Sequence, residues 1–192
     1  MTTRETAVPG VDNRKPVPMA QRKTGRVAIL TADQVEDVEF FYPYYRFVEE
    51  GYDVDVITPA GGLLTGYRGT TLQDTLPLAD ADPKAYDALY VPGGLAPEEL
   101  VANDAAVAFV RTFAERDKPI GSVCHGPRVL AKAGLADGRA MTGFHHVESD
   151  IAEAGGTYVD EPVVTDGHIV TSRRPGDLPR ELAVIIERLR AQ

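Results

Sequence analysis

The sequence has little sulfur and no tryptophan: one cysteine and three methionines occur among 192 residues. A single cysteine cannot form a disulfide within the chain, so a reducing compartment suits the protein. No apolar run approaches the roughly 18 residues that a membrane-spanning helix needs, and the first residues lack the apolar core of a signal peptide. We therefore expect a cytoplasmic protein with no membrane partner.

Basic charge is also scarce, since 20 Lys and Arg face 29 Asp and Glu for a net charge of -9. The first 26 residues are the exception, with six basic and two acidic side chains. The acidic remainder argues against a nucleic-acid partner, which would require clustered Lys and Arg. The basic, proline-containing start has no hydrophobic periodicity. We therefore predict a flexible basic N-terminal extension over residues 1–25 and a single domain over residues 26–192.

Short β-branched runs alternate with helical patterns along this domain. The predicted strands are Arg26–Leu30, Asp53–Thr58, Ala88–Pro92 and Ile120–Val123. The predicted helices are Val38–Glu50, Asp104–Arg116 and a final helix with Leu182, Ile185, Ile186 and Leu189 on one face. Strand–helix–strand repetition indicates an α/β fold: a doubly wound, mostly parallel sheet with helices on both faces. Two β-runs around Asp166-Gly167 predict a C-terminal β-hairpin.

The only cysteine, Cys124, is predicted to lie on a tight turn between a strand and a helix. Ser122 precedes it by two residues and Gly126 follows it by two, which gives the small neighbours that an exposed nucleophile on such a turn needs. A helix that begins near His125 would direct its positive end at the sulfur, and we expect this to lower the thiol pKa. The alternative is a structural cysteine that is simply buried.

Two other loops follow the carboxyl ends of predicted strands, where ligands of such sheets bind. Pro92-Gly93-Gly94 allows backbone N–H groups to approach a ligand, as an oxyanion hole requires, or is only a glycine turn. Glu36 lies in an apolar setting after the first strand. It could be a buried acid with a raised pKa that hydrogen-bonds the sulfur. Capping of the following helix is an equally good explanation.

Four segments carry a resemblance to a known family: ADQVEDVEFFYPYYRFVEEG, VPGGLAPE, SVCHGPRVLAKAG and AGGTYVDEPVVTDGHIVTSRRPGDLP. They resemble the PfpI branch of the ThiJ/PfpI family, which belongs to the class I glutamine-amidotransferase-like superfamily. The resemblance covers the chain from about residue 26 to the C-terminus. It implies a flavodoxin-like sandwich with Cys124 as the nucleophile. It also implies that Glu36 is the partly buried acid bonded to this cysteine, and that the amides of Gly94 and His125 form the oxyanion hole.

In the oligomeric, peptidase-like members of that family, the histidine after the cysteine pairs with a glutamate of a neighbouring subunit. The resemblance places this glutamate at Glu98 and its partner at His125, and it implies a homodimer or a higher homo-oligomer. The tyrosines between Tyr42 and Tyr45 could contribute apolar area to such an interface or to internal packing.

The sequence departs from the family at Phe144-His145-His146, where members commonly have an aromatic residue followed by proline. Adjacent histidines on a helix point about 100° apart, and no cysteine or carboxylate stands at ligand spacing from them. We therefore expect neither a metal nor an organic cofactor, and an altered wall of the substrate pocket.

Three functions fit these residues. The first is a stress-response enzyme of carbonyl detoxification, either a glyoxalase without a thiol cofactor or a protein deglycase. In it Cys124 forms a hemithioacetal and then a thioester with a small carbonyl substrate or a glycated protein or peptide. The second is an intracellular cysteine peptidase in which His125 acts as the base and Glu98 orients it. The third is a non-enzymatic stress protein that senses oxidants through the oxidation of its cysteine.

Overall fold

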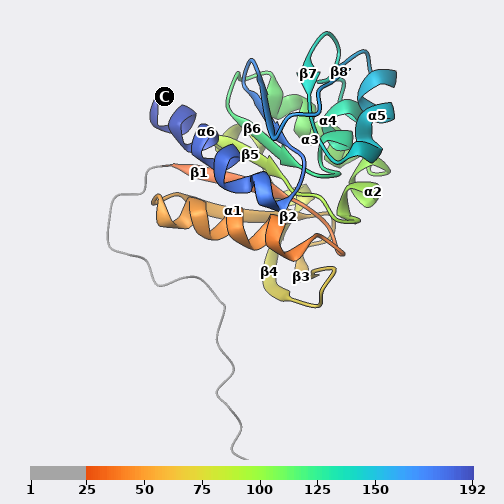
Figure 1. The fold of residues 1–192 in the computed structure, drawn as a ribbon. Coiled ribbons are helices and arrows are strands. Elements are labelled where there is room, and N and C mark those ends of the chain that lie inside the picture. The colour runs from red at the N-terminus through yellow and green to blue at the C-terminus, as the bar shows by residue number, and fades with distance from the viewer. Residues whose placement is uncertain (1–24) are drawn as a thin grey trace, which may run out of the picture.

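The computed structural model describes residues 25–192, so the predicted N-terminal extension lies outside the described residues apart from its last position. Within these residues, eight strands form one sheet in the order β3-β4-β2-β1-β5-β6-β10-β9 (Figure 1). They are β1 (Arg26–Leu30), β2 (Asp53–Thr58), β3 (Gly62–Thr65), β4 (Thr71–Pro77), β5 (Ala88–Val91), β6 (Ile120–Val123), β9 (Val163–Asp166) and β10 (Ile169–Ser172). Two short strands, β7 (Ala140–Met141) and β8 (Thr157–Tyr158), pair separately.

The centre of the large sheet is parallel and its two edges are antiparallel. The strands β2, β1, β5, β6 and β10 pair in parallel, and β4 pairs in parallel with β2. The hairpins β3–β4 and β9–β10 close the edges. The predicted α/β class, the mostly parallel sheet and the C-terminal hairpin are confirmed.

Helices cover both faces of the sheet (Figure 1). They are α1 (Asp37–Glu49), α2 (Ala96–Val101), α3 (Asp104–Ala114), α4 (Pro127–Lys132), α5 (Glu148–Glu153) and α6 (Leu178–Arg190). The described part of the chain also has four single turns of 3-10 helix: η1 (Leu78–Asp80), η2 (Pro83–Ala85), η3 (His145–Val147) and η4 (Pro175–Asp177). Helices α1 and α6 pack together on one face, whereas α2 to α5 form contacts among themselves on the other. Helices therefore shield both faces of the sheet from solvent, as is usual for a parallel sheet.

The hydrophobic pattern explains these elements. The run Val27–Leu30 of β1 is fully buried, as a central strand covered on both faces must be. In α6 the residues Leu182, Ile185, Ile186 and Leu189 are all buried, which confirms the predicted apolar face. The sheet therefore holds the carboxyl ends of β1, β5 and β6 in one fixed layer, next to each other.

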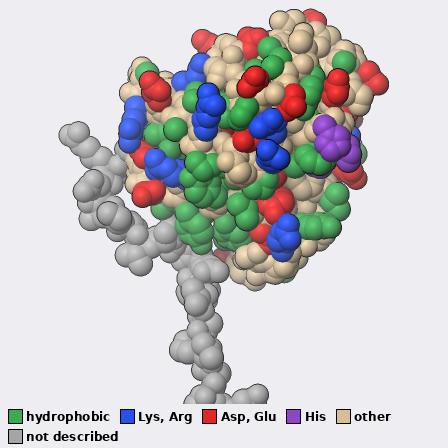
Figure 2. Space-filling view, viewed as in Figure 1, with side chains coloured by type: hydrophobic (Ala, Val, Ile, Leu, Met, Phe, Trp, Pro, Cys, Tyr) green, Lys and Arg blue, Asp and Glu red, His purple; other side chains and the backbone are tan. Residues whose placement is uncertain are grey.

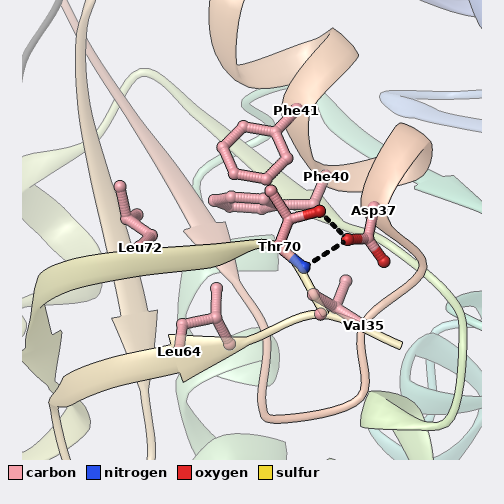
Figure 3. A pocket seen from close by; sticks show the side chains of 8 residues that line it. Val35, Asp37, Phe40, Phe41, Leu64, Thr70 and Leu72 are labelled. Carbon is pink, nitrogen blue, oxygen red and sulfur yellow. Dashed lines mark hydrogen bonds between the residues drawn. The ribbon is translucent and has the colours of Figure 1, made fainter. Parts of the chain in front are cut away.

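A carboxylate fixes the connection between β3 and β4 to the start of α1 (Figure 3). Asp37 is only 7 % exposed and accepts hydrogen bonds from the N–H of Arg68 at 2.7 Å, the N–H of Thr70 at 3.0 Å and the Thr70 hydroxyl. Val35, just before the helix, forms β-bridges with both Gly66 and Gly94. The edge hairpin is thereby tied to the glycine loop that follows β5.

The outer side of α1 exposes apolar side chains. Val38, Tyr42 and Tyr45 are 39–48 % exposed, whereas Tyr44 is buried. Figure 2 shows hydrophobic side chains at the surface over this part of the molecule. Within residues 25–192, no helix has the length and apolar character to span a membrane.

Candidate active site

Cys124 lies directly after β6 in a left-handed backbone conformation with φ of 60°. Few side chains other than glycine adopt this conformation without strain, and strain of this kind is typical of functional turns. Its N–H donates to the Ser172 carbonyl of β10 at 3.0 Å, so the sheet itself fixes the turn. Two residues later the turn requires a glycine, Gly126, because a Cβ at that position would approach the Val91 carbonyl oxygen to 2.3 Å. The structure thus shows the predicted strand-to-helix turn.

The acid beside the sulfur is Glu39, in the first turn of α1. Its side chain is fully buried, its Oε2 accepts the Gly93 N–H at 3.0 Å, and its carboxyl group hydrogen-bonds the Cys124 thiol. Its Oε1 has no hydrogen-bond partner among the described residues. Burial raises the pKa of Glu39 to about 7, with a smaller contribution from the Glu36 charge, although the bonds from the thiol and Gly93 lower it.

The expectation that Glu36 is this acid is wrong. Glu36 is the N-cap of α1, where its Oε2 accepts the N–H of Val38 at 2.8 Å and the N–H of Glu39 at 3.1 Å. Its Oε1 accepts from Arg68 Nε at 3.0 Å. The capping alternative was therefore correct, because an N-cap side chain turns back onto the free N–H groups of its own helix.

Two backbone amides point at the sulfur. The N–H groups of Gly94 and His125 both hydrogen-bond the thiol and favour its ionised form. Gly94 has φ of 77°, and a Cβ there would meet the Glu36 nitrogen at 2.3 Å. A Cβ on Gly93 would lie 2.8 Å from the Cys124 Cβ, so the loop needs both glycines to reach the sulfur. These are the two amides that the family resemblance implies for an oxyanion hole; that role stays a prediction.

The thiol does not have the lowered pKa that the sequence predicts. Burial, the Glu39 charge and the hydrogen bond with Glu39 raise the pKa of Cys124 to about 12, and the amides of Gly94 and His125 offset this only in part. Cys124 as a whole is only 9 % exposed. The α4 helix begins only at Pro127, so its dipole does not overcome a buried carboxylate in contact with the thiol. Near neutral pH the Cys124 thiol therefore keeps its proton, whereas Glu39 is the group that gains or loses one.

The imidazole of His125 lies closer to the sulfur than its adjacent position in the sequence suggests. Its Nδ1 is 3.3 Å from the Cys124 Sγ. Burial lowers the pKa of His125, as do the charges of Arg128 and His146, so the ring is neutral at pH 7. The ring packs against Phe144, with 5.1 Å between ring centroids, and against His146 at 5.9 Å. The unusual Phe144-His145-His146 segment therefore forms the wall of the site beside His125.

Glu98 lies in the first turn of α2 with its side chain 67 % exposed. It forms an ion pair with Arg128 at 3.7 Å, and Arg128 also pairs with Asp150 at 3.1 Å. These three side chains line an open depression of about 560 Å³. The charge of Glu98 favours protonation of His125 in the same chain, but no hydrogen bond joins the two side chains among the described residues.

No group of three or more His, Cys, Asp or Glu side chains within residues 25–192 has the geometry of a metal site. Histidine side chains do gather at one edge of the face that Figure 2 shows. His145 and His146 contact each other with ring centroids 4.2 Å apart, and the Phe144 ring contacts both, tilted against His145 and edge-on to His146. The contacts of this cluster are those of aromatic packing.

Sequence reasoning missed Glu39, although it lies three residues after Glu36 in the same quoted segment. The signal that could have found it is position: Glu39 and Phe40 are buried on the inner side of α1, whereas Val38 is exposed. An acid on the buried side of an amphipathic helix is unusual, and such acids mark functional sites.

The fold and this site define an α/β sandwich with a cysteine on a strained turn, a buried glutamate in contact with the thiol, and two converging amides. A model of the DJ-1/PfpI family matches residues 25–188. A deglycase of Pyrococcus abyssi is 44 % identical over 153 residues, which is 80 % of this chain and 92 % of that protein. The deglycase PfpI of Pyrococcus furiosus is 39 % identical over the same shares of the two chains.

Another relative of similar likeness is the putative cysteine protease YraA of Bacillus subtilis, which is 39 % identical over 80 % of this chain and 91 % of that protein. Among solved structures, a protein of Anabaena variabilis with DJ-1/ThiJ/PfpI-like and ferritin-like domains matches with a TM-score of 0.83 at 37 % identity. The match covers 86 % of this chain and 48 % of that one. The chain belongs to the DJ-1/PfpI family, within its PfpI-like branch.

Proposed function

We propose that the protein is a cysteine-dependent enzyme of carbonyl detoxification that releases glyoxal-type adducts from amines or converts the free aldehyde. The observation that carries this proposal is the contact between the Cys124 thiol and the buried carboxyl of Glu39, beneath the amides of Gly94 and His125. Two relatives at 39 % and 44 % identity are named deglycases, which supports the same reaction class.

In the first step the sulfur of Cys124 attacks the aldehyde carbon of a 2-oxoaldehyde such as methylglyoxal. Glu39, ionised above its pKa of about 7, takes the thiol proton as the carbon–sulfur bond forms. The aldehyde oxygen becomes an alkoxide, and the N–H groups that now face the sulfur stabilise it. The alkoxide then accepts a proton, which completes the hemithioacetal. With a glycated amine, the sulfur replaces the nitrogen at the same carbon, and the free amine leaves with the proton.

In the second step a proton moves from the former aldehyde carbon to the neighbouring ketone carbon through an enediol. This converts the hemithioacetal into the thioester of a 2-hydroxy acid without any external oxidant, because one carbon is oxidised as its neighbour is reduced. The carboxylate of Glu39 and the neutral imidazole of His125, 3.3 Å from the sulfur, are the groups placed to carry this proton. Water then hydrolyses the thioester, which releases the hydroxy acid and restores the thiol.

The test is a parallel assay of methylglyoxal loss, release of amine from methylglyoxal-treated protein, and cleavage of unfolded peptide. Wild type and Cys124→Ala should differ by several orders of magnitude in the first two assays. A suitable matched control is Thr165→Ala, a substitution by alanine at an exposed position of β9. Equal carbonyl turnover by wild type and Cys124→Ala would refute the proposal.

A second candidate function is peptide hydrolysis by the same nucleophile. The 3.3 Å between His125 Nδ1 and Cys124 Sγ favours it, because a cysteine peptidase needs an imidazole in contact with its thiol. The relative named a putative cysteine protease supports the same reading. Cleavage of unfolded peptide that depends on Cys124, without carbonyl turnover, would establish this function in place of the first.

We also propose that Glu98 acts on the His125 of a neighbouring subunit in a homo-oligomer. Its exposed carboxylate and the open depression beside it leave the group accessible to a second copy. If each complete site combines two chains, a mixture of Glu98→Ala and Cys124→Ala subunits regains part of the activity that each lacks alone. Light scattering should then show a dimer or larger particle. A monomer with full activity would refute this arrangement.

A further inference from the structure

A second buried carboxyl group lies behind the site, on α6. Glu181 is 0 % exposed, and its Oε2 accepts hydrogen bonds from the Ser172 hydroxyl at 2.7 Å and the Tyr90 hydroxyl at 3.2 Å. No described residue bonds to its Oε1. Lys, Glu, Arg and Asp are almost never fully buried unless they are paired, and an uncompensated buried charge is costly. The position of Glu181 therefore calls for an explanation.

The partners of Glu181 connect it to the cysteine turn. Ser172 donates its hydroxyl to Glu181 and accepts the Cys124 N–H on its carbonyl at 3.0 Å. Tyr90, fully buried in β5, donates to Glu181 and lies in the electrostatic field of both Glu39 and Cys124. Two carboxyl groups and one thiol thus share a buried polar region that a tyrosine and a serine connect.

Among the described residues, no Lys, Arg or His side chain forms a hydrogen bond or an ion pair with Glu181. Besides burial, the largest effects on its pKa come from the Ser172 hydroxyl of β10, the Tyr90 hydroxyl of β5, the Ser122 backbone of β6 and the Glu39 carboxyl of α1. Burial raises the pKa of Glu181 to about 8 and the Glu39 charge adds to this, although the bonds from Ser172, Tyr90 and Ser122 lower it. Glu181 is therefore largely protonated at neutral pH.

We propose that Glu181 is a positioning residue that sets the proton affinity of the Cys124–Glu39 pair through Tyr90 and Ser172. Two neighbouring acidic groups raise each other's pKa by the same amount when both are ionised. While Glu181 is protonated and uncharged, the Cys124–Glu39 pair therefore loses a proton more readily. When Glu181 ionises at alkaline pH, it raises the pKa of the Cys124 thiol further. The reactivity of the thiol thus rises less steeply with pH than it would with an uncharged residue at position 181.

This inference rests on Cys124 as the nucleophile of the proposed function, but its test requires no substrate. The rate of Cys124 alkylation by iodoacetamide is measured from pH 6 to pH 10 in wild type and Glu181→Gln. Cys124 is the only cysteine, so the mass gain reports on this site alone. The ratio of the two rates should be near one at pH 6 and increase to about three- to tenfold in favour of Glu181→Gln by pH 9.5, a shift of roughly half to one pKa unit.

The matched control is Glu187→Gln, the same substitution at an exposed position of α6. Its rate should follow wild type at every pH. Ser172→Ala removes one donor to Glu181 and keeps the carboxyl, so Glu181 stays protonated to higher pH. Its rate should exceed that of wild type between about pH 8 and 9 and return to the wild-type rate above that range. This variant decides the question if Glu181→Gln does not fold.

A rate ratio that stays constant over the pH range in both Glu181→Gln and Ser172→Ala would overturn the proposal, because a merely structural role changes the rate equally at every pH. The outcome is independent of the proposed function. If the ratio depends on pH but no variant turns over carbonyl substrates, the proposed function fails and the role of Glu181 stands. If wild type turns over carbonyl substrates but the ratio of alkylation rates is constant over pH, the proposed function stands and the role of Glu181 fails.

Discussion

Glu36 and Glu39 stand three residues apart at the start of α1, yet they meet opposite environments. Glu36 caps the helix and reaches outward to Arg68, a side chain that is 68 % exposed. Glu39 points inward, is fully buried and contacts the only cysteine. The same carboxyl group therefore serves helix stability at one position and thiol chemistry at the other. The difference arises from the backbone, because Glu36 has an extended conformation outside the helix, with ψ of 121°.

The same turn has a second buried acid, Asp37, whose three hydrogen bonds hold the β3–β4 connection (Figure 3). Burial would raise the pKa of Asp37, but the bonds from the Thr70 hydroxyl and from the N–H groups of Arg68 and Thr70 lower it overall. The carboxyl group of Glu39 accepts a hydrogen bond from only one backbone N–H, that of Gly93, and its pKa is raised. The number of donors around a buried carboxylate thus separates a structural acid from one that exchanges protons near neutral pH.

The largest expected effect is that of Glu39→Gln on carbonyl turnover. Loss of the proton acceptor should lower kcat/KM at pH 8 by about 10²- to 10⁴-fold. The same change removes the charge that raises the thiol pKa, so alkylation of Cys124 by iodoacetamide should become faster at pH 8. Slower turnover with faster alkylation distinguishes a proton acceptor from a residue that only maintains the fold.

The comparison variant is Glu36→Gln, which keeps an oxygen for the helix cap. At pH 8, above the pKa of Glu39, both its turnover and its alkylation rate should stay within about twofold of wild type, because Glu39 is ionised at that pH with or without the Glu36 charge. If Glu36→Gln lost as much activity as Glu39→Gln, our assignment of the two acids would be reversed.

The second effect concerns stability against pH. The pKa of Glu39 is about 7 in the folded protein and 4.5 as its ordinary value, so the folded state holds a proton that the unfolded state loses between these pH values. The contribution of Glu39 to stability is fully present below about pH 4.5 and is lost as the pH rises through 7. The loss is roughly 3 kcal/mol. Urea unfolding of Glu39→Gln should show a smaller decrease in stability between pH 5 and pH 7.5 than wild type; identical decreases would contradict this pKa.

Most of the fold could be predicted from the sequence, because buried parallel strands and amphipathic helices have strong hydrophobic patterns. The predicted strands Arg26–Leu30, Asp53–Thr58 and Ile120–Val123 agree with β1, β2 and β6, and the hairpin around Gly167 is present. The edge hairpin β3–β4 was missed, because its strands are largely exposed and Thr71–Pro77 lacks a buried alternation. An edge strand of this kind takes its structure from its neighbours.

The candidate site was predictable in part. The turn at Cys124 and the glycine loop have local sequence signatures, and the structure brings Gly94 and His125 to the sulfur as expected. The acid could not be chosen, because the choice between Glu36 and Glu39 depends on the first helical residue, and helix boundaries are the least reliable feature of a sequence. The thiol pKa depends on that same choice, so it was predicted with the wrong sign.

The third effect is that of Asp37→Asn on stability. Asparagine keeps one oxygen but loses the charge and one acceptor for the donors of Arg68 and Thr70, so the variant should lose about 1–3 kcal/mol at pH 7. The pKa of Asp37 is lowered in the folded state, so this stabilisation is present above the ordinary pKa of 3.8 and disappears in acid. Denaturant unfolding should therefore show a large difference from wild type at pH 7 and a small one below pH 3. A difference that persists in acid would mean that the charge of Asp37 is unimportant.

The smallest effect is that of Glu36→Ala, for which the chain has a matched control. Asn103 caps α3 in the same manner, with its Oδ1 accepting the N–H of Ala105 at 3.0 Å and the N–H of Ala106 at 3.1 Å. Removal of either cap should cost about 1 kcal/mol in the free energy of unfolding. Only Glu36→Ala also removes a charge that raises the pKa of Glu39. The midpoint of the pH profile of carbonyl turnover should therefore move to lower pH in Glu36→Ala by a fraction of a unit. It should be unchanged in Asn103→Ala, and equal midpoints in the two variants would show that Glu36 acts on the helix alone.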